Sequence, residues 1–241
     1  MQKKTVRRAE PGNNSVEESQ SWRVESGQEL PDVPVLPGTL LRLDLEVQER
    51  CVDLRAMSRL VLSDLGATLQ ILRLAGTTYG SAEGRPARIE DCISDLGLDA
   101  CLEAVSVRTI PRDDHYNTIA EIWSHSLEIA QDSMQVAEET LDVNPDEAYL
   151  VGLMHSIGML PAALGWTGSN GGASDGIFIG YQLAKAWSLP HPVVAFFAEM
   201  HLAARGTQWQ QIVRSAHNRA IRSTVECPFE REIRPLLRRA M

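Results

Sequence analysis

The fold is set by the stretch NPDEAYLVGLMHSIGML, residues 144–160, which contains the signals for both ends of one helix. Asn144 is a preferred capping residue, Pro145 suits the first helical position, and Glu147 stands at the capping-box position. The apolar residues that follow predict a buried helix that ends near Gly158, because glycine commonly terminates helices.

Apolar residues recur at helical spacing on both sides of this stretch. Three closely spaced prolines in the segment LPDVPVLPGTLLRL predict extended structure before the first helix. Alternating apolar and polar runs are few, and no hairpin signal is present, so we expect an all-α fold. The expected helices run through residues 54–61, 69–76, 88–97, 102–105, 118–139, 144–158, 177–187, 193–202 and 210–222.

The chain divides into a folded part and two tails. Residues 1–29 are polar and lack periodicity, which predicts a disordered N-terminal tail. Residues 30–222 form the expected helical domain, interrupted by a glycine-rich loop, GWTGSNGGASDG, at 165–176. Residues 223–241 form a basic C-terminal tail or short helix that could dock a partner.

Composition excludes several classes of protein. The net charge of −9 argues against a nucleic-acid-binding protein, because phosphate contacts need concentrated lysine and arginine. No apolar run is long enough to span a membrane, and no apolar segment follows the basic N-terminus as in a secretory signal. We therefore expect a cytoplasmic protein that uses neither nucleic acid nor membrane as a partner. The four cysteines are expected to be reduced because they are far apart: Cys51, Cys92, Cys101 and Cys227.

Four of the six histidines follow apolar residues at helical spacing. His125 lies between Ile122 and Ile129, and the other three occupy similar positions in their own helices. A core histidine with one hydrogen bond is the ordinary interpretation of any one of them. Four on separate helices suggest a shared pocket, although sequence alone does not show that they converge. The four histidines are His125, His155, His201 and His217.

The residue after His155 decides what such a pocket would do. A catalytic divalent metal usually needs at least one carboxylate beside its imidazole ligands. Ser156 is a poor substitute, because a serine hydroxyl stays protonated near neutral pH. Three neutral imidazoles are able to bind zinc, but without a carboxylate we expect no bound metal and no cofactor.

Six stretches of the chain together match one known family. They resemble, in order, the HDOD domain, a bacterial signalling relative of the HD-type metal-dependent phosphohydrolases. The resemblance covers about residues 30–222 and implies a multi-helix, HD-like fold. The stretches are LPDVPVLPGTLLRL, SDLGATLQILRLAGTTYG, ARIEDCISDLGLDACLEAV, IWSHSLEIA, AYLVGLMHSIGML and GYQLAKAWSLPHPVVAFFAEMH.

The resemblance also implies roles for single positions. His125 matches the first histidine of the HD pattern, and His155 matches the histidine of the paired His-Asp. Ser156 stands where that aspartate would be, and His217 falls where enzymes of the wider superfamily place a last aspartate.

The chain departs from the pattern of the family at further positions. His201 matches the first position of a His-His pair, whose second position is Leu202. Gly176 stands where many relatives have another histidine. The carboxylates that would hold a metal and activate water are missing, while the packing residues remain. The resemblance therefore implies a vestigial HD-type pocket without catalytic residues.

Three functions follow from these observations. The first is a non-catalytic signal-transduction module that binds a partner protein or a small ligand. The second is a metal-dependent phosphohydrolase of a nucleotide or phosphorylated signal, with His125, His155 and His217 as ligands. The third is a nucleotide-binding sensor that keeps the pocket without turnover. We favour the first, because Ser156 replaces the expected aspartate.

Overall fold

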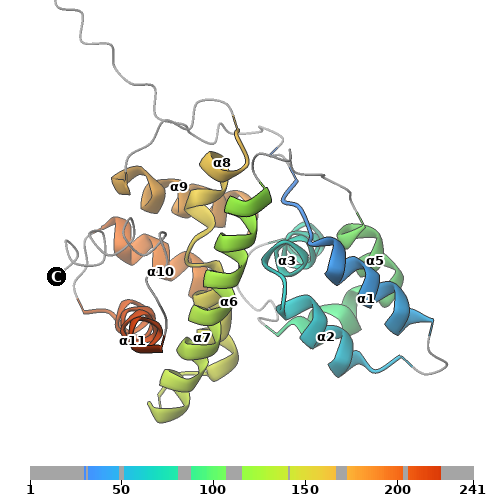
Figure 1. The fold of residues 1–241 in the computed structure, drawn as a ribbon, viewed down its shortest axis with the longest axis horizontal. Helices are drawn as coiled ribbons and strands as arrows, with labels where there is room; N and C mark the ends of the chain where they lie inside the picture. The colour runs from blue at the N-terminus through green and yellow to red at the C-terminus, as the bar shows by residue number, and fades with distance from the viewer. Residues whose placement is uncertain are drawn as a thin grey trace, which may run out of the picture.

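A computed structural model describes eight segments of the chain, and within them the regular structure is entirely helical (Figure 1). The all-α prediction is confirmed. Among the described helices none is both long and apolar enough to cross a membrane. The predicted tail 1–29 and nearly all of the basic segment 223–241 lie outside the described residues, as do Cys51 and Cys227. The described residues are 30, 32–48, 52–80, 88–106, 116–140, 142–166, 173–202 and 206–223.

The N-terminal half of the domain is a group of five helices around α3 (Figure 1). Helix α3 is buried along most of its length, and it packs against α2, α4, α5 and α6. It was expected to end near Gly76 but continues to Tyr79, and Gly80 ends it with a φ of 76°. Gly76 is a buried residue within the helix. The five are α1 (Pro37–Val47), α2 (Leu54–Leu62), α3 (Leu65–Tyr79), α4 (Ile89–Leu96) and α5 (Leu98–Val105).

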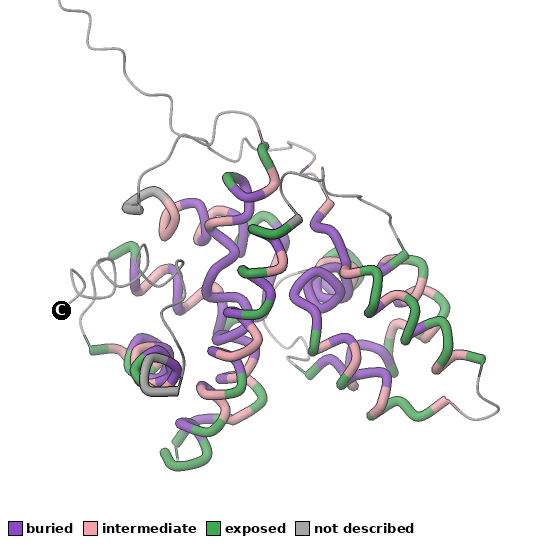
Figure 2. The backbone as a smooth tube through the Cα atoms, in the orientation of Figure 1, coloured by how far each residue is buried: buried purple, intermediate pink, exposed green. Residues whose placement is uncertain are grey.

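The second half is built around a pair of adjacent helices, α6 and α7 (Figure 1). Helix α11 packs against both, and α10 contacts α7, α9 and α11. Figure 2 shows that the buried residues gather on α3 and along α7, which confirms the buried helix predicted from its sequence. The elements are α6 (Tyr116–Glu139), α7 (Pro145–Met154), the short 3-10 helix η1 (Ile157–Met159), α8 (Leu160–Ala163), α9 (Ala173–Ala186), α10 (His191–His201) and α11 (Gln208–Ser223).

Part of the predicted glycine-rich loop is helical instead. Helix α9 begins at Ala173, four residues before the expected start, so Gly176 belongs to the helix. A Cβ atom on Gly158 would lie only 1.8 Å from the carbonyl oxygen of Gly176. The absence of a side chain at Gly158 therefore allows η1 and α9 to pack backbone against backbone. The middle of the predicted loop, 167–172, lies outside the described residues.

The buried carboxylate of Asp64 joins the two halves. Its Oδ1 accepts hydrogen bonds from the amide of Ala67 and the indole of Trp123, both at 3.0 Å. Its Oδ2 accepts one from the amide of Leu36 at 2.8 Å. Asp64 thus caps α3 and also connects that helix to α6 and to the extended segment before α1.

Candidate functional site

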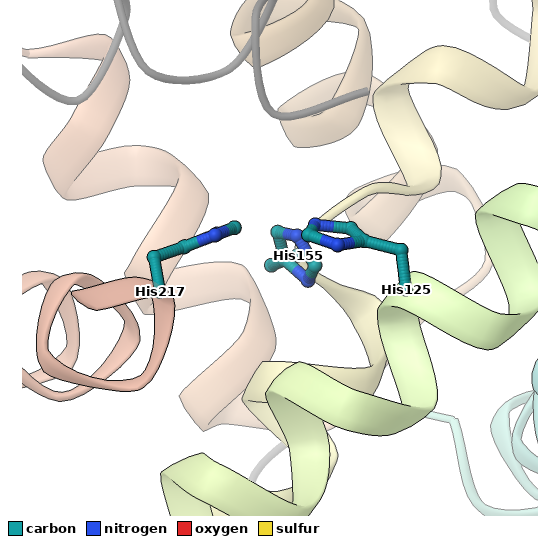
Figure 3. Close-up of side chains that lie close together, drawn as sticks. All are labelled: His125, His155 and His217. Carbon is teal, nitrogen blue, oxygen red and sulfur yellow. The ribbon is translucent and has the colours of Figure 1, made fainter. Parts of the chain in front are cut away.

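Three of the predicted histidines meet inside the second half of the domain (Figure 3). One ring nitrogen from each of His125, His155 and His217 lies within 4.8 Å of the other two. The ring centroids are 5.0–5.2 Å apart. The structure therefore shows the convergence that sequence could only suggest, and we call these residues the three-histidine cluster.

Each member of the three-histidine cluster comes from a different element. His125 projects from the middle of α6, His155 follows the last residue of α7, and His217 lies on α11. Their exposed fractions are 3%, 8% and 4%, so all three side chains are buried. Helix α7 brings His155 to this position because its cap at Asn144 and its apolar residues hold it against α6.

The tautomer of His155 follows from its hydrogen bond. Its Nδ1 lies 2.6 Å from the carbonyl oxygen of Gly152. A carbonyl only accepts, so Nδ1 carries the proton and Nε2 carries a lone pair. In a continuing helix the Gly152 carbonyl would accept the amide of Ser156. Instead, α7 ends at Met154, earlier than predicted, and a turn leads into η1.

Ser156, which stands in the place of the expected aspartate, has a neutral partner. Its hydroxyl lies 2.5 Å from the hydroxyl of Ser126, and both residues are buried. Sequence reasoning did not single out Ser126. The sequence feature that could have pointed to Ser126 is the His-Ser pair, which occurs at both 125–126 and 155–156.

The surroundings of the cluster disfavour positive charge on two of its histidines, His125 and His155. Burial lowers the pKa of His125 to about 4. Burial also lowers the pKa of His155 well below its usual value, and the imidazoles of His217 and His125 lower it further. The hydrogen bond to Gly152 opposes this effect. His125 and His155 are therefore neutral near pH 7.

A small cavity adjoins the cluster on the side of His155 and Ser156. Its volume is about 40 Å³, room for about three water molecules. Apart from these two polar residues it is lined by glycine and apolar side chains, contributed by η1, α9, α10 and α11. The cavity is far smaller than the roughly 300 Å³ or more of ordinary small-molecule sites.

The expectation for His201 was wrong. This residue is exposed at the end of α10, and it does not belong to the cluster. Its ring stacks on Tyr181 with the centroids 5.9 Å apart, and it also contacts the ring of Phe178. The apolar residues that precede it do mark an inward face, and Met200 is buried, but His201 is the last residue of the helix and its side chain is exposed.

The residues of the cluster do not fit the carboxylate-bearing metal centre of an HD-type phosphohydrolase. Among the described residues, the groups that meet here are three imidazoles, with neither a carboxylate nor a thiolate. Ser156 offers only a hydroxyl already bonded to Ser126. A hard cation such as Mg²⁺ prefers oxygen ligands and would find none of the usual ones among these side chains.

A larger concavity of about 430 Å³ lies elsewhere, where α2 and the start of α4 face α6 and α7. None of the predicted site residues lines it. Arg88 at its rim forms ion pairs with Asp146 at 3.0 Å and with Glu90 at 3.9 Å, and Arg55 lies 3.7 Å from Glu90. The charged side chains that line this concavity therefore largely form ion pairs with one another.

Solved structures of low sequence identity share this fold. The MmoQ response regulator of Methylococcus capsulatus str. Bath is 20% identical with a TM-score of 0.64, and the match covers 87% of this chain and 97% of that chain. A virulence factor of Campylobacter jejuni is 17% identical with a TM-score of 0.52, and the match covers 78% of this chain and 75% of that chain. No curated protein sequence matches the chain.

A protein-family comparison gives the identity that the resemblance implied. The model of the HDOD domain matches residues 33–165, which is more than half of the chain. The matched part includes His125, His155 and Ser156, whereas His217 lies beyond it. The chain belongs to the HDOD domain family.

Proposed function

We propose that this protein is a non-catalytic regulatory module of signal transduction, which acts by binding a partner protein or a small ligand. One observation carries the proposal. At the position where the family resemblance leads us to expect a catalytic aspartate stands Ser156, and its hydroxyl is paired with Ser126. The pair leaves no ionised group there to hold a metal or to activate water.

The chemistry of the three-histidine cluster supports this proposal. Hydrolysis of a phosphate ester needs an activated water, and a general base works best with a pKa near the working pH. The imidazole of His125, with a pKa of about 4, is a weak base at neutral pH. The adjoining cavity of about 40 Å³ also has no room for a phosphorylated substrate.

The size of this cavity also counts against the two alternatives. A phosphohydrolase of nucleotides and a nucleotide-binding sensor would both need to admit a nucleotide beside His155. A site of this volume suits a ligand of a few atoms.

We further propose that the protein works in the cytoplasm and that nucleic acid is not its partner, in keeping with its net charge of −9.

A hydrolysis assay tests the proposal. The full chain is incubated with nucleotides, cyclic dinucleotides and a general phosphodiester, each with Mg²⁺, Mn²⁺, Fe²⁺ or Zn²⁺. We expect release of product no faster than that given by the variant His155→Ala. Turnover that is abolished by His155→Ala and retained in His201→Ala, a variant of the exposed histidine, would establish the phosphohydrolase instead.

A further inference from the structure

We propose that the three-histidine cluster reversibly binds one borderline transition-metal ion, Zn²⁺ in the first place, and that this ion is a regulatory ligand of the domain. The inference rests on the function proposed above, because it names the small ligand that the module senses. It departs from the expectation of no bound metal, which rests on Ser156 and not on the meeting of the three imidazoles.

The arrangement of the nitrogen atoms carries the first step. Three imidazoles with one open position form an established ligand set for zinc. Zinc–nitrogen bonds of about 2.0–2.1 Å in a tetrahedral site place the nitrogens about 3.3 Å apart. The nitrogens of the cluster lie within 4.8 Å of one another, so each pair has to close by at most about 1.5 Å. Metal binding would therefore require the three side chains to move by this amount.

The hydrogen bond of His155 carries the second step. Metal-bound histidines usually donate their other N–H to a carboxylate or a backbone carbonyl, which fixes the tautomer. Nδ1 of His155 donates to the Gly152 carbonyl in this way. Its Nε2 is buried and has no hydrogen-bond partner among the described residues. Figure 3 shows the rings of His125, His155 and His217 turned toward one another.

The ligand types decide which ions suit the site. Imidazole nitrogens favour Zn²⁺, Co²⁺, Ni²⁺ and Cu²⁺, whereas Mg²⁺, Mn²⁺ and Ca²⁺ prefer oxygen. The cavity beside His155 and Ser156 has room for water or a small anion as a fourth ligand. Because no carboxylate of the described residues offsets the charge of the ion, we expect weaker binding than at a four-ligand structural site. Weaker binding suits a signal that must be released.

The positions of the three ligands give the ion a structural effect. His217 belongs to α11, whereas His125 and His155 belong to the adjacent helices α6 and α7. In the structure, α11 packs on α6 through a cluster of apolar side chains and through the ion pair of Arg219 with Glu139. A bound ion would link the three elements directly. The position of α11 is therefore what metal binding would control.

Metal titration of the full chain tests the inference. The protein is treated with a chelator and titrated with Zn²⁺, with Co²⁺ as a spectroscopic probe and Mg²⁺ as a comparison. We expect one Zn²⁺ per chain, a rise in the thermal midpoint of about 5 °C at saturation, and slower amide exchange in α11. Co²⁺ should give the visible absorption of a tetrahedral site, and Mg²⁺ should have no effect.

Two kinds of variant complete the experiment. His217→Ala and the closer isostere His217→Asn should both abolish stoichiometric binding, and circular dichroism shows whether each has folded. His191→Ala and His201→Ala remove exposed histidines and should leave binding unchanged. Absence of stoichiometric Zn²⁺ would overturn the inference, as would binding that survives in a folded His217 variant.

The inference and the proposed function fail in different ways. If the protein binds no metal and hydrolyses nothing, the inference is wrong and the proposed function stands. If it binds Zn²⁺ and also shows turnover that His155→Ala abolishes, the metal site stands. In that case the proposed function is wrong, and with it the regulatory role of the ion.

Discussion

At the scale of the residue, the imidazole of His125 behaves unlike a histidine in water. It is 3% exposed, and burial lowers its pKa to about 4. In the unfolded chain the same side chain has a pKa of about 6.5. Between these two values the unfolded chain takes up a proton that the folded protein does not. His155 shifts in the same direction.

This difference predicts how stability depends on pH in the metal-free protein. The pKa of His125 is lower in the folded protein than in the unfolded chain. Its contribution to the free energy of unfolding is therefore fully present above pH 6.5 and is lost as the pH falls toward 4. For His125 alone we expect the free energy of unfolding to drop by about 2 kcal/mol between pH 7 and pH 5. Urea denaturation across this range measures it. In the variant His125→Gln the drop should be smaller by that amount, and an unchanged drop would contradict the prediction.

At the scale of the element, the close approach of α6 and α7 depends on a glycine. A Cβ atom on Gly152 would lie 2.8 Å from both the carbonyl oxygen of Ile129 and the Cα of Ala130. Both of these contacts are with backbone atoms, which cannot rotate away. The same glycine supplies the carbonyl that orients His155. The packing of these two helices and the geometry of the site are therefore linked.

The variant Gly152→Ala should consequently be destabilised, by about 2–4 kcal/mol, because α7 has to move away from α6. Gly38→Ala is the matched control. Gly38 lies in the first turn of α1, and a Cβ atom there would have no neighbour within 4 Å. This variant should be stabilised by about 0.5–1 kcal/mol. Chemical denaturation measures both, and equal effects in the two variants would show that close packing at Gly152 is unimportant.

At the scale of the whole molecule, hydrogen bonds of Asp64 connect the two helical groups. Its carboxylate accepts hydrogen bonds from α3, from α6 and from the extended segment at Leu36. Buried apolar residues of both groups also form one continuous core. Loss of this carboxylate would leave the indole N–H of Trp123 and two amides without their acceptor.

We therefore expect Asp64→Ala to cost about 3–5 kcal/mol and to broaden the unfolding transition as the two groups lose their coupling. Asp53→Ala is the control, because Asp53 also caps a helix, is exposed and accepts a hydrogen bond from the amide of Arg55 within the described part of the chain. That change should cost about 1 kcal/mol. Equal losses in the two variants would mean that Asp64 acts as a helix cap alone.

Local signals in the sequence determined the helices. The cap at Asn144, the proline at 145 and the apolar spacing suffice because a helix is formed by contacts between residues close in the chain. The sequence predicted the ends of the helices less accurately than their middles. Gly76 was expected at a helix end and Gly176 in a loop, but both lie inside helices. A glycine that ends a helix and one that packs within a helix look the same in sequence.

The site depended on tertiary structure. The sequence placed His125, His155, His201 and His217 on apolar faces, and three of them meet while His201 is exposed. Helical spacing gives the direction of a side chain around its own axis. It does not give the position of one helix along another, which is decided by packing between distant segments. Only that packing brought the three imidazoles together.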